Sequence, residues 1–133
     1  MPMNRPTAAE LIEAVREYLE RKVQPGLTGA AAYENVVAIN ALKILAREAE
    51  TGARALAQEH DRLSRLLGHD ASVMELNSEL CTRIAAGDFD ARRGELFGHL
   101  YRSTLGKLAV DNPRYAAYRR ALARTGLNQV EQA

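Results

Sequence analysis

The sequence predicts an all-α protein, and the clearest evidence is the way its helices would begin. Thr7 with Glu10, and Ser72 with Glu75, have the spacing of capping boxes. In such a box the hydroxyl accepts a hydrogen bond from the first turn, and the carboxylate three residues later accepts one from the capping residue. Apolar residues then recur at helical spacing, and no segment shows convincing strand alternation.

A third predicted helix start is Asn112 followed by Pro113, because proline lacks the N–H group that a first helical turn leaves unpaired. The length suits one hydrophobic core. We therefore expect a single helical domain over residues 1–133, with an ordered core of about 7–126. The predicted fold is a bundle of about six helices packed around a central, buried second helix.

The first helix is predicted over residues 8–23 and is amphipathic, with charged residues on the side opposite its apolar face. Pro25 and Gly26 should end it. The second helix, over residues 30–50, carries apolar residues in nearly every direction, which is typical of a buried helix. We therefore expect the other helices to surround it.

Gly52 is expected to separate this second helix from a third over residues 53–67, which Gly68 ends. The Ser72 cap opens a fourth helix that runs to about residue 86, where Gly87 follows. Both helices are amphipathic. A sixth helix is predicted over residues 113–125, with Tyr115 and Tyr118 directed inward.

The fifth helix, over residues 90–110, contains Gly94, Gly98 and Gly106, each of which costs about 0.8–1 kcal/mol relative to alanine. Packing must recover that free energy. Gly94 and Gly98 border the apolar stripe, where they would allow another helix to approach closely. That helix could belong to a partner, which would make the two glycines an interface, or to the same domain.

The charge balance excludes some partners, since 18 basic and 17 acidic residues give a net charge of +1. With so small a net charge, the chain has no overall positive electrostatic potential that would attract nucleic acid or an anionic membrane surface. No apolar run approaches the roughly 20 residues that a membrane span requires. With a single cysteine, Cys81, and no signal-like N-terminus, we expect a cytoplasmic protein.

The histidines do not have metal-ligand spacing, because only His99 has a carboxylate, Glu95, one turn away. A metal site needs three or four protein ligands, so we expect no metal and no cofactor. Cys81 is expected to fill the core as a small apolar residue. Since no catalytic motif is present either, the sequence favours a non-catalytic protein.

Asn40 and Asn77 lie among apolar positions and are predicted to be buried polar residues. A buried amide must form hydrogen bonds or cost about 1–3 kcal/mol. We favour bonds to the backbone or between the two amides over contact with a ligand.

Basic residues lie in the first turns of the last two predicted helices, where a cation is unfavourable next to the helix dipole. Nearby aspartates could compensate this charge, or a bound phosphate or carboxylate could do so. In the second case the anion contacts would be Arg93, Lys107 and Arg114.

Three segments, over residues 5–20, 37–42 and 107–115, resemble an uncharacterised family of small bacterial all-helical proteins, a domain of unknown function. Members of that family are often encoded beside acyl-CoA dehydrogenase-like and aminoglycoside-phosphotransferase-like proteins. The resemblance therefore implies partnership with such an enzyme, and it implies no catalytic residues.

Together these observations predict a non-catalytic accessory module that binds a protein partner, a phosphotransferase-like or acyl-CoA dehydrogenase-like enzyme. The alternative is a small-molecule binder, or a weak enzyme, acting on a phosphorylated or CoA-linked acid. A homodimer that uses the first or fifth helix is a third possibility.

Overall fold

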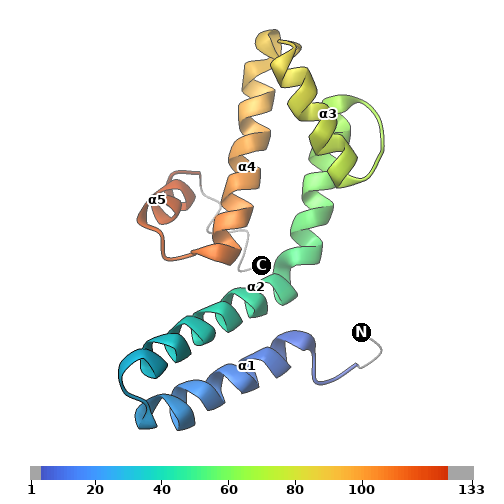
Figure 1. Ribbon diagram of the computed structural model, residues 1–133. Coiled ribbons are helices and arrows are strands. Elements are labelled where there is room, and N and C mark those ends of the chain that lie inside the picture. Colours follow the sequence, from blue (N-terminus) through green and yellow to red (C-terminus); the bar gives the residue numbers. More distant parts are fainter. Residues whose placement is uncertain (1–3, 126–133) are drawn as a thin grey trace. The chain divides into compact units, whose positions relative to one another are not determined.

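The computed structural model describes residues 4–125, and within that range it consists of α-helices joined by turns, with no strand (Figure 1). The predicted all-α class is confirmed. No helix in the described range is long and apolar enough to cross a membrane. The five α-helices of this range are α1 (Ala8–Tyr18), α2 (Gly29–Leu67), α3 (Val73–Ala85), α4 (Arg93–Asp111) and α5 (Ala116–Thr125).

The chain divides into two compact units. Within residues 4–125, the first unit contains residues 4–53 together with Val110–Asn112, and the second contains Arg54–Ala109 and residues 113–125. The divisions fall inside α2 and near the end of α4. The expectation of one domain over residues 1–133 stays a prediction.

In the first unit α1 begins at the predicted capping box. The Thr7 hydroxyl accepts a hydrogen bond from the Glu10 backbone N–H at 3.2 Å, and the Glu10 carboxylate accepts one from the Thr7 N–H at 2.6 Å. The predicted helix over 8–23 is continued beyond α1 by a π-helical turn, Leu19–Val23, and a 3-10 turn, Gln24–Gly26.

Side-chain amides hold these turns against the start of α2. Asn35 Nδ2 donates to the Leu19 carbonyl at 3.3 Å and to Gln24 Oε1 at 2.7 Å. The Gln24 amide in turn donates to the Ala32 carbonyl at 3.3 Å. These bonds tie the irregular turns to the first residues of α2, and the Leu19 carbonyl also accepts from the Gln24 backbone N–H.

The expected break at Gly52 is wrong, because α2 is one continuous helix of 39 residues. A single glycine in a helix costs about 1 kcal/mol. That cost is too small to interrupt a segment whose other residues near Gly52 are mostly good helix formers. The second and third predicted helices are therefore one element, which is why the described range holds five α-helices in place of the expected six.

The expected burial of the whole 30–50 segment is also wrong. Ile39 and Ala46 are 4 % and 5 % exposed, but Val37 and Leu45 are 50 % and 52 % exposed. Asn40, predicted to be buried, is exposed as well. Within its unit this part of α2 is covered along one face, so the apolar residues of its other faces contact solvent.

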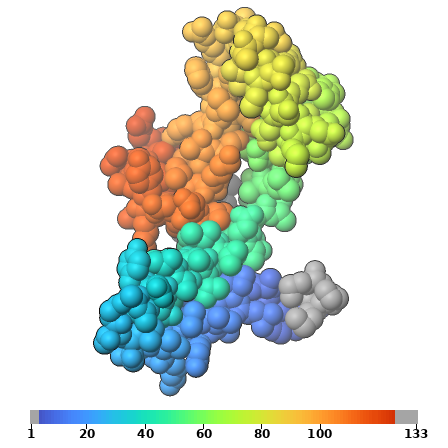
Figure 2. Space-filling model, viewed as in Figure 1, coloured from blue at the N-terminus to red at the C-terminus, as the bar shows by residue number. Residues whose placement is uncertain are grey.

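The second unit contains a well-defined hydrophobic core where the end of α2, α3 and the start of α4 meet. Figure 2 shows the side chains of α3 packed closely over the end of α2. Leu63, Leu76 and Phe89 are fully buried there. The remaining buried members of this cluster are Leu66, Leu67, Leu80 and Leu96.

Both ends of α3 form as predicted. The Ser72 hydroxyl accepts from the Glu75 N–H at 3.3 Å, and the Glu75 carboxylate accepts from the Ser72 N–H at 3.0 Å. Gly68 and Gly87 follow α2 and α3 with φ values of +83° and +81°. This left-handed conformation is the common way to end a helix, and it favours glycine.

The last helix begins later than expected. Asn112 and Pro113 lie in a turn before α5, which starts at Ala116. A proline that follows asparagine is as typical of a turn as of a helix start, and here the turn forms. Tyr118 is buried as expected, at 5 % exposure, whereas Tyr115 is 50 % exposed.

Candidate functional site

A cleft of about 300 Å³ lies in the second unit between α2 and α4. Residues spaced three or four apart on a helix share a face, so each helix presents its lining residues on one side. The lining from α2 is Arg62, Arg65 and Leu66, and the lining from α4 is Glu95, His99 and Arg102.

Arg62 is half-buried in this cleft, and its guanidinium is only partly hydrogen-bonded. Its Nη2 donates to the Ser103 hydroxyl at 3.3 Å, but its buried Nε has no partner among the described residues. Burial lowers the pKa of Arg62. The carboxylate of Glu59 opposes this shift, and the neighbouring Arg102 and Arg65 add to it. An arginine nonetheless stays charged at any physiological pH.

His99 is the buried polar residue of the cleft, at 5 % exposure. Its Nδ1 is buried and has no hydrogen-bond partner among residues 4–125. Burial lowers the pKa of His99, and the positive charge of Arg62 lowers it further, against the opposing effect of Glu59. The imidazole is therefore neutral at pH 7, because an unperturbed histidine already titrates below that pH.

The carboxylates nearest the cleft have hydrogen-bond donors of their own. Glu95 Oε2 accepts from Arg92 Nη2 at 2.6 Å and from Arg92 Nε at 3.1 Å. Glu59 Oε1 accepts from Asn77 Nδ2 at 3.2 Å. Asn77, predicted to be buried, is half-buried and bonds to this side chain rather than to the backbone or to Asn40.

This arrangement is suited to binding an anion. A buried N–H group without an acceptor costs about 1–3 kcal/mol. Arg62 Nε is such a donor, and the guanidinium groups of Arg65 and Arg102 line the same cleft. Guanidinium groups match the oxygen atoms of phosphate and carboxylate, so an anion in the cleft would accept hydrogen bonds from these arginines.

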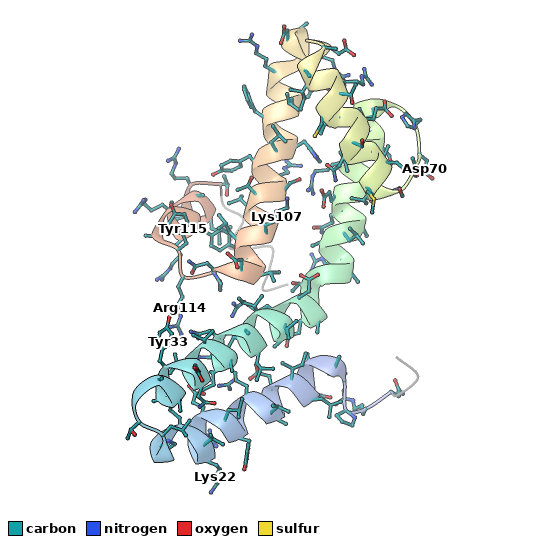
Figure 3. All side chains as sticks on the ribbon, viewed as in Figure 1. Lys22, Tyr33, Asp70, Lys107, Arg114 and Tyr115 are labelled. Atoms are coloured by element: carbon teal, nitrogen blue, oxygen red, sulfur yellow. The ribbon has the colours of Figure 1, made fainter. Side chains whose placement is uncertain are left out.

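The anion contacts expected from the sequence lie elsewhere. Arg93, Lys107 and Arg114 are exposed, and none of the three lines this cleft. Figure 3 shows Lys107 on α4 and Arg114 in the turn before α5. Their role in anion binding stays a prediction.

The sequence contained a local signal for the cleft that the predictions did not use. Arg62 and Arg65 are one turn apart, as are His99 and Arg102. Each pair therefore marks a polar strip on a helix. Nothing in the sequence indicates that these two strips face each other, and a pair of adjacent basic residues on one helix is usually a solvated surface.

The predicted interface glycines, Gly94 and Gly98, are exposed on α4. Apart from its chain neighbours and the backbone of its own helix, a Cβ atom added at either position would meet no atom of the described structure within 4 Å. Close packing inside the domain, one of the two interpretations of these glycines, therefore does not occur among the described residues.

The other two histidines form local contacts around the turn between α2 and α3. His60 Nε2 lies 2.7 Å from Asp70 Oδ1 and 3.1 Å from the Ala71 carbonyl, and Figure 3 shows Asp70 in this turn. His69 Nε2 lies 2.6 Å from Glu79 Oε2. Cys81, which we expected in the core, is exposed, because the α3 face that carries it is not covered by another helix of the unit.

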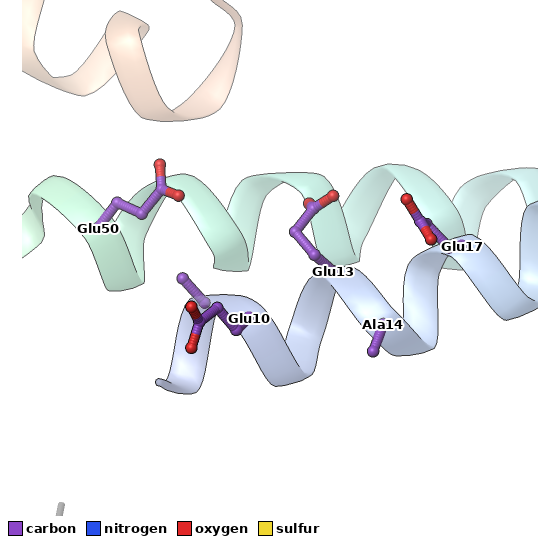
Figure 4. A pocket seen from close by; sticks show the side chains of 6 residues that line it. Glu10, Glu13, Ala14, Glu17 and Glu50 are labelled. Carbon is purple, nitrogen blue, oxygen red and sulfur yellow. The ribbon is translucent and has the colours of Figure 1, made fainter. Parts of the chain in front are cut away.

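A second hollow, of about 310 Å³, lies in the first unit between α1 and α2 and is acidic (Figure 4). Glu10, Glu13 and Glu17 of α1 and Glu50 of α2 line it, together with two alanines. Two of these carboxylates are engaged locally, Glu10 in the capping box and Glu13 with Arg16 Nε at 2.9 Å. Its negative charge makes it unsuitable for an anion.

The fold and the site together define an all-α protein with an arginine-lined cleft between two of its helices. Residues 25–115 match the family model described as Domain of unknown function (DUF6285), and the chain belongs to that family. The match includes α2, α3 and α4, and thus every residue that lines the α2–α4 cleft. Comparisons with curated proteins and with solved structures gave no match.

Proposed function

We propose that this protein is a binding protein for a small anionic ligand, which it holds in the cleft between α2 and α4. The observation that carries the proposal is the pair of buried nitrogen atoms without partners, Arg62 Nε and His99 Nδ1. They belong to a cleft that also contains Arg65 and Arg102. Unpaired buried nitrogen atoms are rare in folded proteins and call for a specific explanation. A bound anion explains both atoms at once.

The test is a calorimetric titration of the protein with sodium sulfate and sodium phosphate in a buffer free of other polyvalent anions. Arg102→Ala should weaken binding about tenfold, since a hydrogen bond to a charged group contributes about 1.5 kcal/mol or more. Arg102 is exposed and forms no hydrogen bond or ion pair with the other residues of the range 4–125, so the fold should be unaffected.

Arg93→Ala and Arg114→Ala are the matched controls, because both side chains are exposed and lie outside the cleft lining. We expect both variants to bind sulfate with the affinity of the wild type. If Arg93→Ala or Arg114→Ala binds sulfate more weakly than the wild type while Arg102→Ala binds it as tightly as the wild type, the anion binds at the helix starts predicted from the sequence. Absence of saturable binding by the wild type would contradict anion binding altogether.

A second function, docking to a protein partner, is favoured by the outer face of α4. Gly94 and Gly98 are open to solvent there, while Phe97 and Tyr101 are 62 % and 45 % exposed. Two glycines that cost helix stability and have open space at the Cβ position, beside two exposed aromatic rings, suit the close approach of another helix. The partner class implied by the resemblance is a phosphotransferase-like or acyl-CoA dehydrogenase-like enzyme.

Gly98→Leu tests this second function. A leucine side chain fits into open space at this position and removes the helix cost of glycine, so the isolated protein should be as stable as the wild type or about 1 kcal/mol more stable. Binding to the purified partner enzyme should fall at least tenfold, because the leucine would hold the two helices apart.

The matched control is Gly26→Leu, which adds the same side chain to another exposed glycine with open space around it. It should leave partner binding unchanged. Light scattering on both variants reports whether the partner is a second copy of this chain. Unchanged affinity of Gly98→Leu for the enzyme and an unchanged oligomeric state would contradict a docking role for α4.

A further inference from the structure

We infer that the ligand of the α2–α4 cleft carries a doubly charged tetrahedral group, that of a phosphate monoester, and that His99 becomes protonated when this group binds. The inference rests on the proposed function, and it goes further by naming the chemical class of the ligand. Three features of the cleft support it: the charge that it leaves unbalanced, the state of His99, and the polarity of its walls.

The charge of the cleft favours a dianion. Arg62, Arg65 and Arg102 line it, while Glu95 is already paired with Arg92 outside the lining. Besides Glu95, the carboxylate of Glu59 acts on the cleft, because its negative charge favours the charged forms of Arg62 and His99. Three guanidinium groups against one carboxylate leave a surplus that one negative charge does not balance. A phosphate monoester is mainly a dianion at pH 7, since its second pKa is about 6.

The charges around His99 explain the coupled proton uptake. Arg62 and Glu59 act on it from α2, Arg65 lines the same cleft from that helix, and Glu95 and Arg102 do so from α4. In the free protein, burial and the charge of Arg62 keep the ring neutral. A dianion in the cleft would offset the Arg62 charge and offer an oxygen atom to Nδ1. Protonated histidine is a donor at both nitrogen atoms, so the bound state stabilises the imidazolium.

The walls of the cleft favour a polar ligand over an acyl chain. Leu66 is the one apolar residue among those that line it, and the other lining side chains are charged or titratable. A ligand site normally buries the body of its ligand against apolar and aromatic side chains. The apolar surface of this cleft comes from Leu66 and from the aliphatic stems of charged side chains, and no Phe, Tyr or Trp lines it. Its volume of about 300 Å³ exceeds what a bare phosphoryl group would fill. The group bonded to the phosphate is therefore hydrophilic.

The experiment is a set of calorimetric titrations with sulfate, methyl phosphate and acetate at about pH 6.5 and about pH 8, on either side of the pH where a histidine near a dianion would titrate. Sulfate keeps both charges over this range, so any change in its affinity reports on the protein. We expect sulfate and methyl phosphate to bind at least tenfold more tightly than acetate. Titrations in two buffers of different ionisation enthalpy should show proton uptake by the wild type.

The direction of the pH effect follows from linkage. Because the complex holds the His99 proton more tightly than the free protein does, sulfate affinity should rise about threefold to tenfold as the pH falls from about 8 to about 6.5. His99→Gln should bind sulfate with an affinity that does not depend on pH. The control His69→Gln, which changes an exposed histidine paired with Glu79, should keep the wild-type pH dependence.

The outcomes separate this inference from the proposed function. If neither sulfate nor methyl phosphate binds, anion binding itself is contradicted. If sulfate binds to the arginine cleft without proton uptake and with constant affinity between the two pH values, the proposed function stands and the protonation of His99 is overturned. If acetate binds as tightly as sulfate, the proposed function stands and the preference for a dianion is overturned. The proton uptake is measured on the wild type, so the test does not depend on the folding of His99→Gln.

Discussion

Replacing Phe89 by alanine should lower the free energy of unfolding by about 3–5 kcal/mol, the range for truncating a buried aromatic side chain. The ring is 2 % exposed and belongs to the core of the second unit. The guanidinium groups of Arg83 and Arg92 lie over this ring, 5.2 and 5.3 Å from its centroid, so both cation–π interactions would also be lost. Urea unfolding followed by circular dichroism measures the effect.

The chain offers a matched control in its other phenylalanine, Phe97. That side chain is 62 % exposed on α4. Phe97→Ala should change the free energy of unfolding by less than about 1 kcal/mol, because little apolar surface returns to water. Equal losses for the two variants, or a larger loss for Phe97→Ala, would contradict the core as described.

Arg62→Met should stabilise the free protein and at the same time abolish sulfate binding. Methionine keeps most of the apolar volume of the side chain but removes a half-buried guanidinium whose Nε has no partner. Removing the unpaired N–H group should raise the free energy of unfolding by about 1–3 kcal/mol. The loss of the hydrogen bond to Ser103 reduces this gain. Thermal unfolding and calorimetry with sulfate, measured on the same preparation, report the two effects.

The control for this prediction is Arg54→Met, which makes the same change at an exposed arginine of the same helix. Its unfolding temperature and sulfate affinity should equal those of the wild type. A less stable Arg62→Met protein that still binds sulfate would show that Arg62 has a structural role and that the anion binds elsewhere. Opposite changes in stability and affinity are typical of residues that a protein keeps for binding.

The helix ends were predictable from the sequence where a short motif satisfies its own backbone groups. The Thr7 and Ser72 capping boxes form at the expected positions, and Gly68 and Gly87 adopt the left-handed conformation that ends a helix. In each case the bonds join residues within a few positions of one another. No distant contact is needed to form them, so the local sequence is sufficient.

The errors in the predicted fold came from sequence features that are compatible with two different local structures. Gly52 can end a helix or lie within one, and the small cost of glycine let α2 continue through it. Asn112 and Pro113 can begin a helix or form a turn, and here they form a turn. The apolar pattern around Val37 indicated a buried helix, although apolar side chains are buried only if another element covers them. Half of the Val37 surface is exposed.

The sequence by itself determined that this chain forms helices and where most of them begin and end, because capping, helix propensity and glycine conformation act between near neighbours. The tertiary structure alone decided which faces are covered, and so placed Arg62 and His99, from two different helices, in one cleft. The neutral imidazole and the unpaired guanidinium nitrogen arise there from burial and from charges that act through space. Such effects depend on distance in the folded molecule, which spacing along the chain does not give.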